Sequence, residues 1–487
     1  MRVTPLTSLL LALSVSVSVS AKDSRTFAVN HFYGNGPLTM GRMDPIVDPG
    51  RASSHVHAIQ GGSNFALTMT NTSALDSRCT SSLVKADKSN YWTPSLYFQD
   101  PVNGSFISVP MFYMNVYYFF EPTDDTITAF PPGLRMFIGD SFMRTPPPGG
   151  PGLVIDLNLG TPQPIQWTCP RSNYDIPSYP QDSDGLHGVG IQDPNNMGAG
   201  VGFPDMNCDG YASPLRADIH FPSCYNPAAG LSDYKNNMQF PSSNGTSDGK
   251  ANCPRGWIHT PHLFYEVYWD TQKFQDMWTQ GQGNQPFILS NGDRTGYSLH
   301  GDFIAGWDVD VLQHIIDTCN TGTAAMDKCP GLPAGGLNDP STSCNIANLV
   351  PEPIFGVLDK LPGNNPPTGW DNVEPTPSTT STNTIPASTA VHGWSHIGCY
   401  QDNPDRVLSA IILADLVNVT STGCIAYCNI EGFTMAGTEY GSQCFCGNSL
   451  YGSWPISHTK CNMKCEGDAT ETCGGSWALS IFEKKSG

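Results

Sequence analysis

The apolar residues upstream of residue 362 occur in short runs that are rich in aromatic and β-branched side chains. Two of these runs are 108–120 and 263–269, and clusters of Gly, Pro, Asn and Asp separate them from their neighbours. This arrangement predicts strands joined by turns. Only the segment 307–319 repeats its apolar residues at helical spacing. These residues are Val309, Leu312, Ile315 and Ile316. We therefore predict a mostly β body with long loops and few helices.

The first residues of the chain have the pattern of a secretory signal peptide. A charged start at Met1-Arg2 leads into the apolar run 9–13 and a Ser/Val stretch that ends in small residues at 19–21. We predict a signal peptide over residues 1–21, with cleavage after Ala21. No later stretch approaches the roughly 20 apolar residues of a membrane-spanning helix, and the charged C-terminus disfavours a GPI anchor. The sequence thus predicts a secreted protein, extracellular or held in the cell wall.

A segment that is rich in Pro, Ser, Thr and Asn divides the chain in two. Residues 363–390 contain hardly any apolar side chain, which is typical of an extended, O-glycosylated linker. The body at 22–362 carries eight cysteines and the module at 393–483 carries the other eight. This even division favours two units that are stapled independently.

Charge and cysteine content limit the classes of function. The 43 acidic and 24 basic residues give a formal net charge of −19, which disfavours nucleic acid and anionic lipid as partners. Sixteen cysteines in an exported chain indicate disulfides. Four glycosylation sequons agree with the same compartment. They lie at Asn71, Asn103, Asn244 and Asn418.

The C-terminal module has a dense cysteine pattern. We expect its eight cysteines to form disulfides. They are Cys399, Cys424, Cys428, Cys444, Cys446, Cys461, Cys465 and Cys473. Because Cys424 and Cys428 are four residues apart, one face of a helix would carry both sulfurs, and the helix could be stapled at two points to a small sheet. A unit of this size needs such staples to remain folded.

Two motifs in this module are specific: Cys-Phe-Cys-Gly-Asn at 444–448 and Thr-Cys-Gly-Gly at 472–475. On these motifs and the eight cysteines, residues 393–483 closely resemble the WSC domain, which occurs in wall-stress sensors and in fungal secreted enzymes. The resemblance implies a small α+β module that binds cell-wall polysaccharide, with β-glucan as the expected partner. Near 467–469 the chain lacks a sequon that many relatives carry. A zinc site built from the cysteines is the competing interpretation, which an oxidising compartment disfavours.

Sugar rings bind to exposed aromatic faces, and neighbouring polar groups recognise the hydroxyls. The candidate carbohydrate-binding residues are Tyr400, Tyr440, Trp454 and Trp477. Each of them could instead belong to the core of the module, since a small module must bury some aromatic surface.

Three segments of the body, 43–57, 260–270 and 289–308, stand out. The first ends in Ser-His-Val-His, and the third contains Leu-Ser-Asn-Gly-Asp-Arg-Thr-Gly-Tyr-Ser-Leu-His-Gly-Asp-Phe followed by Gly-Trp-Asp. Together they resemble a widespread fungal domain of unknown function that often precedes WSC modules, over about 30–320. The resemblance implies a family and no activity.

Residues two apart in an extended segment face the same way, so His55 and His57 present two imidazoles, and His300 and Asp302 an imidazole and a carboxylate. If the fold brings the pairs together, these four residues form a candidate set for a divalent metal or for acid–base catalysis. The alternatives are a polar cleft without catalysis, or side chains that cap turns and bind loop backbone.

Glutamate is scarce in the body, which draws attention to Glu266. Glu266 would share one strand face with His262, Phe264, Tyr268 and Asp270, and we add Glu266 and His262 to the candidate catalytic residues. A glycosidase needs two carboxylates about 5 to 10 Å apart. Glu266 could therefore act with Asp270, Asp302 or Asp308. A buried glutamate held by a partner explains the same residues.

Several other chemistries are disfavoured. Cleavage after Ala21 leaves Lys22 at the N-terminus, where a copper-dependent oxidative enzyme would need histidine. Residues 296–301 miss the serine-hydrolase elbow by one position, and the glycine-rich segment 198–202 lacks the lysine of a phosphate-binding loop. The sequence thus favours a wall-associated glycoprotein that binds polysaccharide through its module. The alternative is a metal-dependent enzyme acting on wall polysaccharide and targeted by that module.

Overall fold

The computed structural model describes two compact units, which divide at positions 374 and 375. The described residues are 22–33, 36–170, 184–186, 199–210, 214–243, 245, 248–370, 393–403, 406–408, 411–413, 419–430, 433–448, 450 and 455–485. The predicted signal peptide and positions 371–390 of the predicted linker lie outside these ranges. Within them, no helix is long and apolar enough to cross a membrane.

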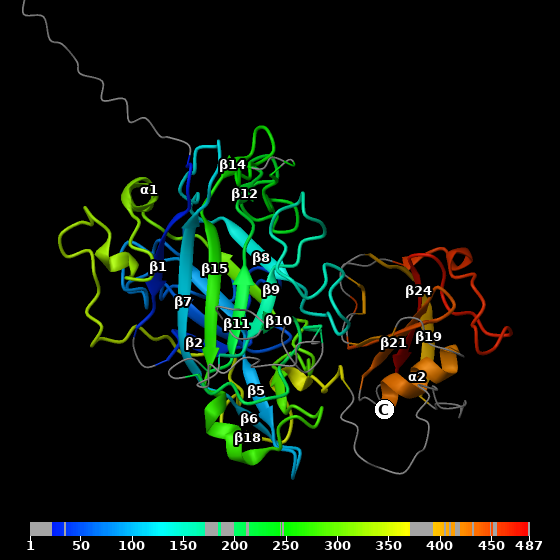
Figure 1. Cartoon of the computed structure of the whole chain (residues 1–487). Coiled ribbons are helices and arrows are strands. Elements are labelled where there is room, and N and C mark those ends of the chain that lie inside the picture. The colour runs from blue at the N-terminus through cyan, green and yellow to red at the C-terminus, as the bar shows by residue number, and fades with distance from the viewer. Residues whose placement is uncertain are drawn as a thin grey trace, which may run out of the picture. The chain divides into compact units, whose positions relative to one another are not determined.

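The first layer of the N-terminal unit is a six-stranded antiparallel sheet (Figure 1). Its strands in spatial order are β1 (Thr26–His31), β7 (Met111–Phe120), β15 (His262–Trp269), β11 (Arg216–His220), β9 (Ile165–Thr168) and β10 (Ala199–Gly200). Along β7, buried Val116, Tyr118 and Phe120 alternate with half-buried Tyr117 and Phe119. This alternation directs one face of the sheet into the core. Strands β7 and β15 confirm the strands predicted within 108–120 and 263–269.

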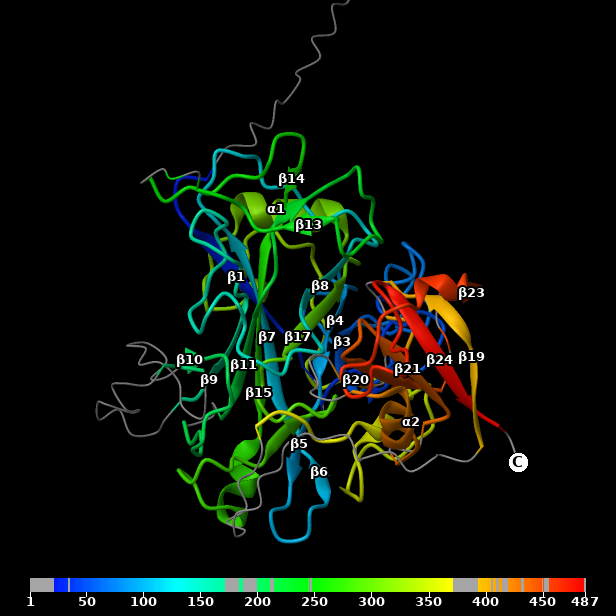
Figure 2. The same cartoon turned by 90° about the vertical axis from the view of Figure 1, so that its right-hand side faces the viewer.

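The second layer is a five-stranded antiparallel sheet, which lies beside β7 and β15 in Figure 2. Its strands in order are β2 (Thr39–Gly41), β3 (His57–Gly61), β4 (Asn90–Pro94), β17 (His300–Ile304) and β8 (Arg135–Gly139). Every residue of β3, β4 and β17 is buried. Tyr91 and Phe303 belong to the main core that the two sheets share. Trp92 and Ile304 belong to a second apolar cluster with Met43. The five-stranded sheet is therefore covered on both faces.

Two small sheets and four helical segments complete the N-terminal unit. The small sheets contain β16 (Phe287–Leu289), β5 (Leu96–Gln99), β6 (Phe106–Ser108) and β18 (Val357–Leu358), and β13 (Met238–Gln239), β12 (Cys224–Tyr225) and β14 (Ile258–His259). The helical segments are η1 (Thr271–Met277), α1 (Val309–Thr318), η2 (Met326–Lys328) and η3 (Pro362–Asn364).

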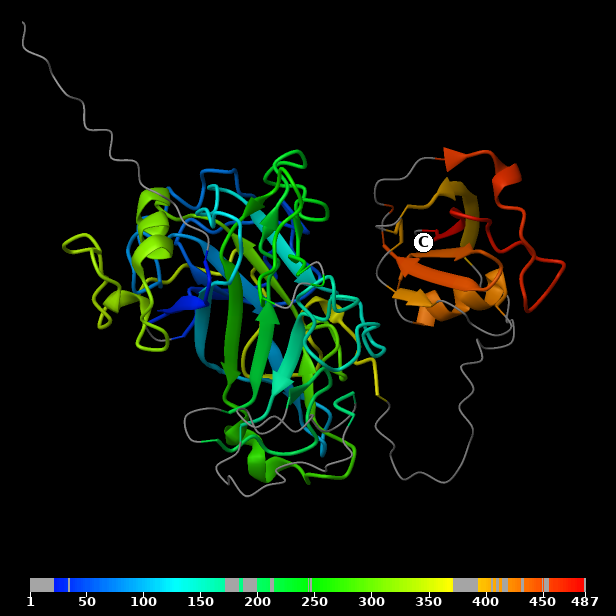
Figure 3. The same cartoon turned by 45° about the horizontal axis from the view of Figure 1, so that its top comes forward.

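Helix α1, yellow-green in Figure 3, confirms the helix predicted within 307–319. The side chain of Asp308 caps it by accepting hydrogen bonds from the backbone of Asp310 and Val311. Three of the four apolar residues at helical spacing, Leu312, Ile315 and Ile316, are buried in the main core, whereas Val309 in the first turn is exposed.

The described part of the C-terminal unit is a disulfide-rich sheet with one α-helix. The sheet contains β20 (Ile411–Leu413), β22 (Gln443–Gly447), β21 (Met435–Glu439), β24 (Ala478–Lys484), β19 (Trp394–Gln401) and β23 (Pro455–Ile456), in that order. The helical segments are α2 (Ser421–Ile430) and η4 (His458–Lys460). Disulfides Cys424–Cys444 and Cys428–Cys446 join α2 to β22, which confirms the predicted double staple.

Disulfides account for every cysteine of the chain. In the module they also include Cys399–Cys461 and Cys465–Cys473, and in the body Cys79–Cys344, Cys169–Cys208, Cys224–Cys253 and Cys319–Cys329. A disulfide sulfur is not available as a thiolate ligand. The competing zinc interpretation is therefore wrong.

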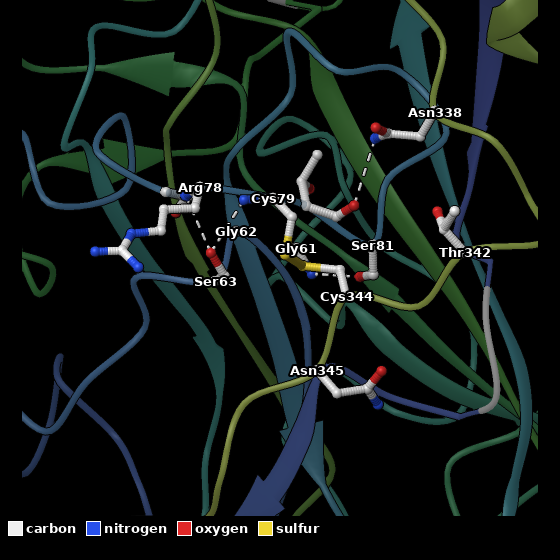
Figure 4. Close-up of a disulfide and its surroundings, with 12 residues drawn as sticks. Gly61, Gly62, Ser63, Arg78, Cys79, Ser81, Asn338, Thr342, Cys344 and Asn345 are labelled. Carbon is white, nitrogen blue, oxygen red and sulfur yellow. Dashed lines mark hydrogen bonds between the residues drawn. A yellow bond between two sulfur atoms is a disulfide. The ribbon is translucent and has the colours of Figure 1, made fainter.

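The disulfide Cys79–Cys344 braces the end of β3 (Figure 4). The backbone amide of Cys79 donates to Ser63 Oγ, and the amide of Gly61 donates to Ser81 Oγ. A Cβ at Gly61 would lie 1.8 Å from the carbonyl oxygen of Ser89, so only glycine fits there. The bond thus ties the segment around residue 344 to the strand that begins with His57.

Replacing both Cys79 and Cys344 by Ser should lower the free energy of unfolding by about 3 to 5 kcal/mol, because the cross-link restrains a long loop of the denatured chain. The two cysteines are separated by 265 positions, against 10 for Cys319 and Cys329, whose double Ser variant is the control. Guanidinium unfolding of both variants provides the measurement. Equal losses would contradict loop entropy as the main source of the stabilisation.

Candidate functional site

Two histidines of the candidate site begin β3 and β17, the strands on either side of β4 in the five-stranded sheet. His57 is the first residue of β3 and pairs with Pro94 of β4. His300 is the first residue of β17, and two residues further on Asp302 pairs with Trp92. Since β4 lies between β3 and β17, the two histidines stand on either side of Pro94. His55 precedes β3 by two positions and joins them. All three histidines are buried.

The three imidazoles converge through their Nε2 atoms. Nε2 of His300 lies 3.0 Å from Nε2 of His55 and 3.4 Å from Nε2 of His57. The His55 and His57 rings lie 4.3 Å apart between centroids. Nitrogen ligands at the usual 2.0 to 2.1 Å from a tetrahedral zinc ion are separated by about 3.4 Å. The spacing of these nitrogens therefore suits a divalent metal ion.

In two of these rings, His300 and His55, the other ring nitrogen, Nδ1, contacts a neighbouring polar group. Nδ1 of His300 donates to the backbone carbonyl of Ser298 at 2.8 Å, which leaves its Nε2 as a lone-pair atom. Nδ1 of His55 lies 2.9 Å from the hydroxyl of Ser54. The carboxylate of Asp293 accepts hydrogen bonds from the backbone amides and hydroxyls of Thr295 and Ser298. The motif at 289–303 thus builds the turn that orients His300.

Burial keeps the three imidazoles neutral. It lowers the pKa of His55 and of His57 well below the usual 6.5, and the neighbouring imidazoles add to the effect, while the backbone of Met43 opposes it at His57. Burial also lowers the pKa of His300, to about 4, against its hydrogen bond to the Ser298 backbone. A neutral imidazole is the form that binds a metal ion.

Asp302 does not join the three histidines in a single ligand set. The ligand atoms of His55, His57 and His300 lie within 4.8 Å of one another, whereas Asp302 forms a second such group with His57 and Asp44. Asp302 is fully buried, and burial raises its pKa well above the usual value. Sequence reasoning did not assign Asp44 to the site, because only the fold brings the 43–48 segment over β3 and β17.

His262 and Glu266, the other two predicted catalytic residues, lie elsewhere, on β15 of the six-stranded sheet. Glu266 forms an ion pair with Arg216 at 3.0 Å. His262 lies 3.1 Å from the Glu121 carboxylate and 3.1 Å from Nδ1 of His220. Burial raises the pKa of Glu266, and Arg216 opposes this shift. The contacts match the alternative in which a buried glutamate is held by a partner.

The three carboxylates suggested as a catalytic partner for Glu266 have contacts or positions of their own. Asp308 caps α1, and Asp270 forms an ion pair with Lys273. Asp302 belongs to the other sheet and shares a face with Trp92, away from the main core. The pairing of Glu266 with any of these carboxylates stays a prediction.

In the C-terminal unit, two of the predicted carbohydrate-binding aromatics are exposed. The exposed fractions are 58% for Tyr440 and 47% for Trp477, while Tyr400 is half-buried and packs beside the module core. Trp454 lies outside the described residues. Tyr440 and Trp477 both adopt left-handed backbone conformations, with φ of 52° and 53°. Such conformations are uncommon for aromatic residues and concentrate at functional sites.

A half-buried arginine supports the ring of Trp477. The guanidinium of Arg406 lies 5.0 Å from the centroid of Trp477 and 5.2 Å from that of Phe445. Its Nη1 atom contacts the carboxylates of Asp402 at 2.5 Å and Glu439 at 2.9 Å. Burial, followed by the nearby charge of Asp402, raises the pKa of Glu439 to about 8. Sequence reasoning missed Arg406, whose position only the fold reveals.

The module also contains a cavity of about 460 Å³ beside the first turn of α2. Polar groups and one aromatic ring line it, and they include His396, His458, Thr422, Glu471 and Phe482. Glu471 accepts hydrogen bonds from the backbone amide and hydroxyl of Thr422. Of the predicted aromatics that the structure describes, Tyr400, Tyr440 and Trp477, none lines this cavity.

Comparison with known families identifies both units. A family model described as a domain of unknown function, DUF1996, matches residues 44–307, which is more than half of the chain. The chain belongs to this family. A WSC domain model matches residues 396–475. The DUF1996 match includes the three histidines, Asp44 and Asp302, and carries no assigned activity.

Curated relatives resemble part of this DUF1996 protein. A WSC domain-containing protein of Arthroderma benhamiae is 40% identical over 111 residues, which are 22% of this chain and 12% of the relative. A putative fungistatic metabolite of Chaetomium globosum is 44% identical over 102 residues, 20% of this chain and 44% of the relative. Human Kremen protein 1 is 34% identical over 94 residues, 18% and 19% respectively. The chain thus matches less than half the length of each of these relatives.

The depressed pKa of His300 predicts a loss of stability in acid for the metal-free protein. Stability from the neutral imidazole is present above pH 6.5 and lost as the pH falls toward the folded-state pKa of about 4. At about 1.4 kcal/mol per pKa unit, the loss is about 3 kcal/mol. Chemical unfolding in chelator at pH 6.5 and pH 4 should show His300→Gln losing less than the parent protein. His314→Gln, at a half-buried position outside the cluster, should follow the parent, and identical losses in all three proteins would contradict the prediction.

Proposed function

We propose that this protein is a secreted, wall-associated glycoprotein that binds β-glucan through its WSC module. The observation that carries the proposal is the pair of exposed aromatic rings, Tyr440 and Trp477, on turns that meet through backbone hydrogen bonds. The amide of Tyr440 donates to the carbonyl of Gly475 at 3.3 Å, two positions before Trp477. Exposed rings in strained turns, next to polar groups, suit the faces and hydroxyls of pyranose sugars.

The charged residues that contact Trp477 hold its ring in a fixed position. Arg406 stacks against the ring and is itself held by Asp402 and Glu439, whose side chains are almost fully buried. Rigid aromatic anchors lose little conformational entropy on binding. The surface formed by Tyr440 and Trp477 is therefore preorganised for binding a sugar.

The disulfides and two exposed sequons are compatible with the proposed secretion and glycosylation. Disulfides pair all sixteen cysteines, as in proteins that fold in an oxidising compartment. Asn71 and Asn103, two of the four sequon asparagines, are exposed and open to glycosylation. A linker over 363–390 would let the module raise the effective concentration of the body at the wall.

Replacing Tyr440 and Trp477 by Ala should weaken binding of the full-length protein to insoluble β-1,3-glucan by about ten-fold or more, because hot-spot aromatic residues contribute about 2 kcal/mol each. Sedimentation with the polysaccharide provides the measurement, with chitin and cellulose in parallel. Phe112→Ala is the matched control, since Phe112 is also 47% exposed but lies on β7 of the body. If His458→Ala in the cavity abolishes binding while the double variant binds normally, the sugar site lies in that cavity instead.

A second candidate function is a metal-dependent enzyme that acts on wall polysaccharide. The observation that favours it is the convergence of Nε2 from His55, His57 and His300. Three neutral nitrogen ligands leave one position of a tetrahedral ion for water, and an ion at such a site supplies Lewis-acid activation of that water. His55 is 4% exposed and follows exposed Ser54, so it is the member of the cluster nearest the solvent.

For this second candidate, the full-length protein loaded with Zn²⁺ or Mn²⁺ should release soluble sugars from β-glucan, and removal of the ion by a chelator should stop the release. His300→Gln should lower the rate at least 100-fold by removing a ligand. His314→Gln is the control variant. Release that continues in chelator would rule out a metal-dependent reaction.

A further inference from the structure

Three buried polar atoms without hydrogen-bond partners meet beside the three-histidine cluster. They are both carboxylate oxygens of Asp302 and Nδ1 of His57, which the backbone of Met43 approaches without meeting hydrogen-bond geometry. Both side chains are fully buried. A buried polar atom with no partner costs about 1 to 3 kcal/mol, and more if it is charged. Three such atoms in one place indicate a group that completes their coordination.

Asp44 contributes a third side chain at this place. It lies in the segment that covers the five-stranded sheet, between Met43 and Ile46 of the second apolar cluster. Its Oδ1 accepts hydrogen bonds from the backbone amides of Ile46 at 2.9 Å and Val47 at 3.0 Å. These bonds fix the carboxylate while leaving Oδ2 for a further ligand. The ligand atoms of Asp44, His57 and Asp302 lie within 4.8 Å of one another.

The charge of this group is not compensated by a side chain. Among the described residues, no lysine or arginine forms an ion pair with Asp44 or Asp302. Burial raises the pKa of Asp44 to about 7, and burial together with the nearby carboxyl of Asp44 raises the pKa of Asp302 well above its usual value. Two buried carboxylates without a counter-charge are costly, and a divalent cation would neutralise both.

We propose that Asp44, His57 and Asp302 form a second cation site, and that His57 bridges it to the three-histidine site. His57 would use Nε2 toward His55 and His300 and Nδ1 toward the two carboxylates. When the second ion binds, the bridging imidazole gives up its ring proton, the two carboxyl groups give up the protons they hold, and all of these protons pass to solvent. One nitrogen and two carboxylate oxygens suit Zn²⁺ or Mn²⁺ better than Ca²⁺, which prefers oxygen ligands alone. The proposal rests on the three-histidine metal site of the second candidate function.

The test is the metal stoichiometry of the full-length protein. After dialysis against a chelator, equilibrium dialysis with Zn²⁺ and elemental analysis should give two ions per chain. Asp302→Asn should bind one ion, retained by the histidines, and His55→Gln should also lose one. Asp87→Asn is the matched control, because Asp87 is an equally buried carboxylate that hydrogen-bonds to Asn30 and Tyr91 outside the cluster. It should retain two ions.

Magnetic coupling provides a readout that a merely structural aspartate would not change. Two Cu²⁺ ions joined by one imidazole couple strongly, so the fully loaded parent protein should lack the paramagnetic resonance signal of isolated Cu²⁺. Asp302→Asn loaded with one Cu²⁺ should show that signal. If Asp302→Asn fails to give the near-ultraviolet circular dichroism of the folded parent, Asp44→Asn takes its place.

The outcomes separate this proposal from the one on which it rests. One ion per chain, lost in His55→Gln but retained in Asp302→Asn and Asp44→Asn, overturns the second site and leaves the three-histidine site standing. No bound ion overturns both. Two ions that persist in Asp302→Asn and Asp44→Asn, with an uncoupled copper signal, are adventitious and overturn the bridged site.

Discussion

The burial of the five-stranded sheet on both faces is the constraint on which the body depends. A sheet that is covered on one side only can direct its polar residues to water. Here the second face is covered by the segment that contains Met43 and Ile46, so polar side chains on that face must find partners inside the protein. His57, His300 and Asp302 all lie there. Their chemistry follows from the absence of water, which keeps the imidazoles neutral and makes an unpaired carboxylate costly.

The strand order gives the three-histidine cluster its geometry. Adjacent strands of a sheet are about 4.8 Å apart, so residues on β3 and β17, with β4 between them, are too distant for backbone contact. Their side chains meet because β4 presents Pro94, which is compact, between His57 and His300. Cys79–Cys344 braces the far end of β3, and the turn organised by Asp293 fixes the start of β17. The nitrogens are thus positioned by the scaffold, with no need of mobile loops.

Local patterns in the sequence were sufficient to predict the strands, α1 and the stapling of α2, because each depends on residues within one turn or one strand. The pairs His55/His57 and His300/Asp302 were predicted for the same reason, since alternation along an extended segment is a local property. The division of those residues between two ligand groups was not predictable. It depends on Asp44, which reaches the site only when its segment folds over Trp92 and Ile304. The partnership of Glu266 with Arg216 likewise requires knowing that β11 lies beside β15.

The difference between local patterns and features that only the fold reveals also applies to the aromatic residues of the module. A sequence shows which aromatic residues are present, but exposure depends on backbone conformation, and Tyr440 and Trp477 are exposed where the chain adopts left-handed turns. Holding non-glycine residues there costs about 1 kcal/mol or more each, and the surrounding structure must provide that free energy. In this module the nearby disulfides and the Arg406 ion pairs supply it. Rigid neighbouring groups thus position side chains in both units. In the body they hold a buried set of imidazoles and carboxylates, and in the module they hold an exposed pair of aromatic rings. An ion bound by such a buried set would be bound as part of folding, whereas a partner of the exposed rings would bind after folding is complete.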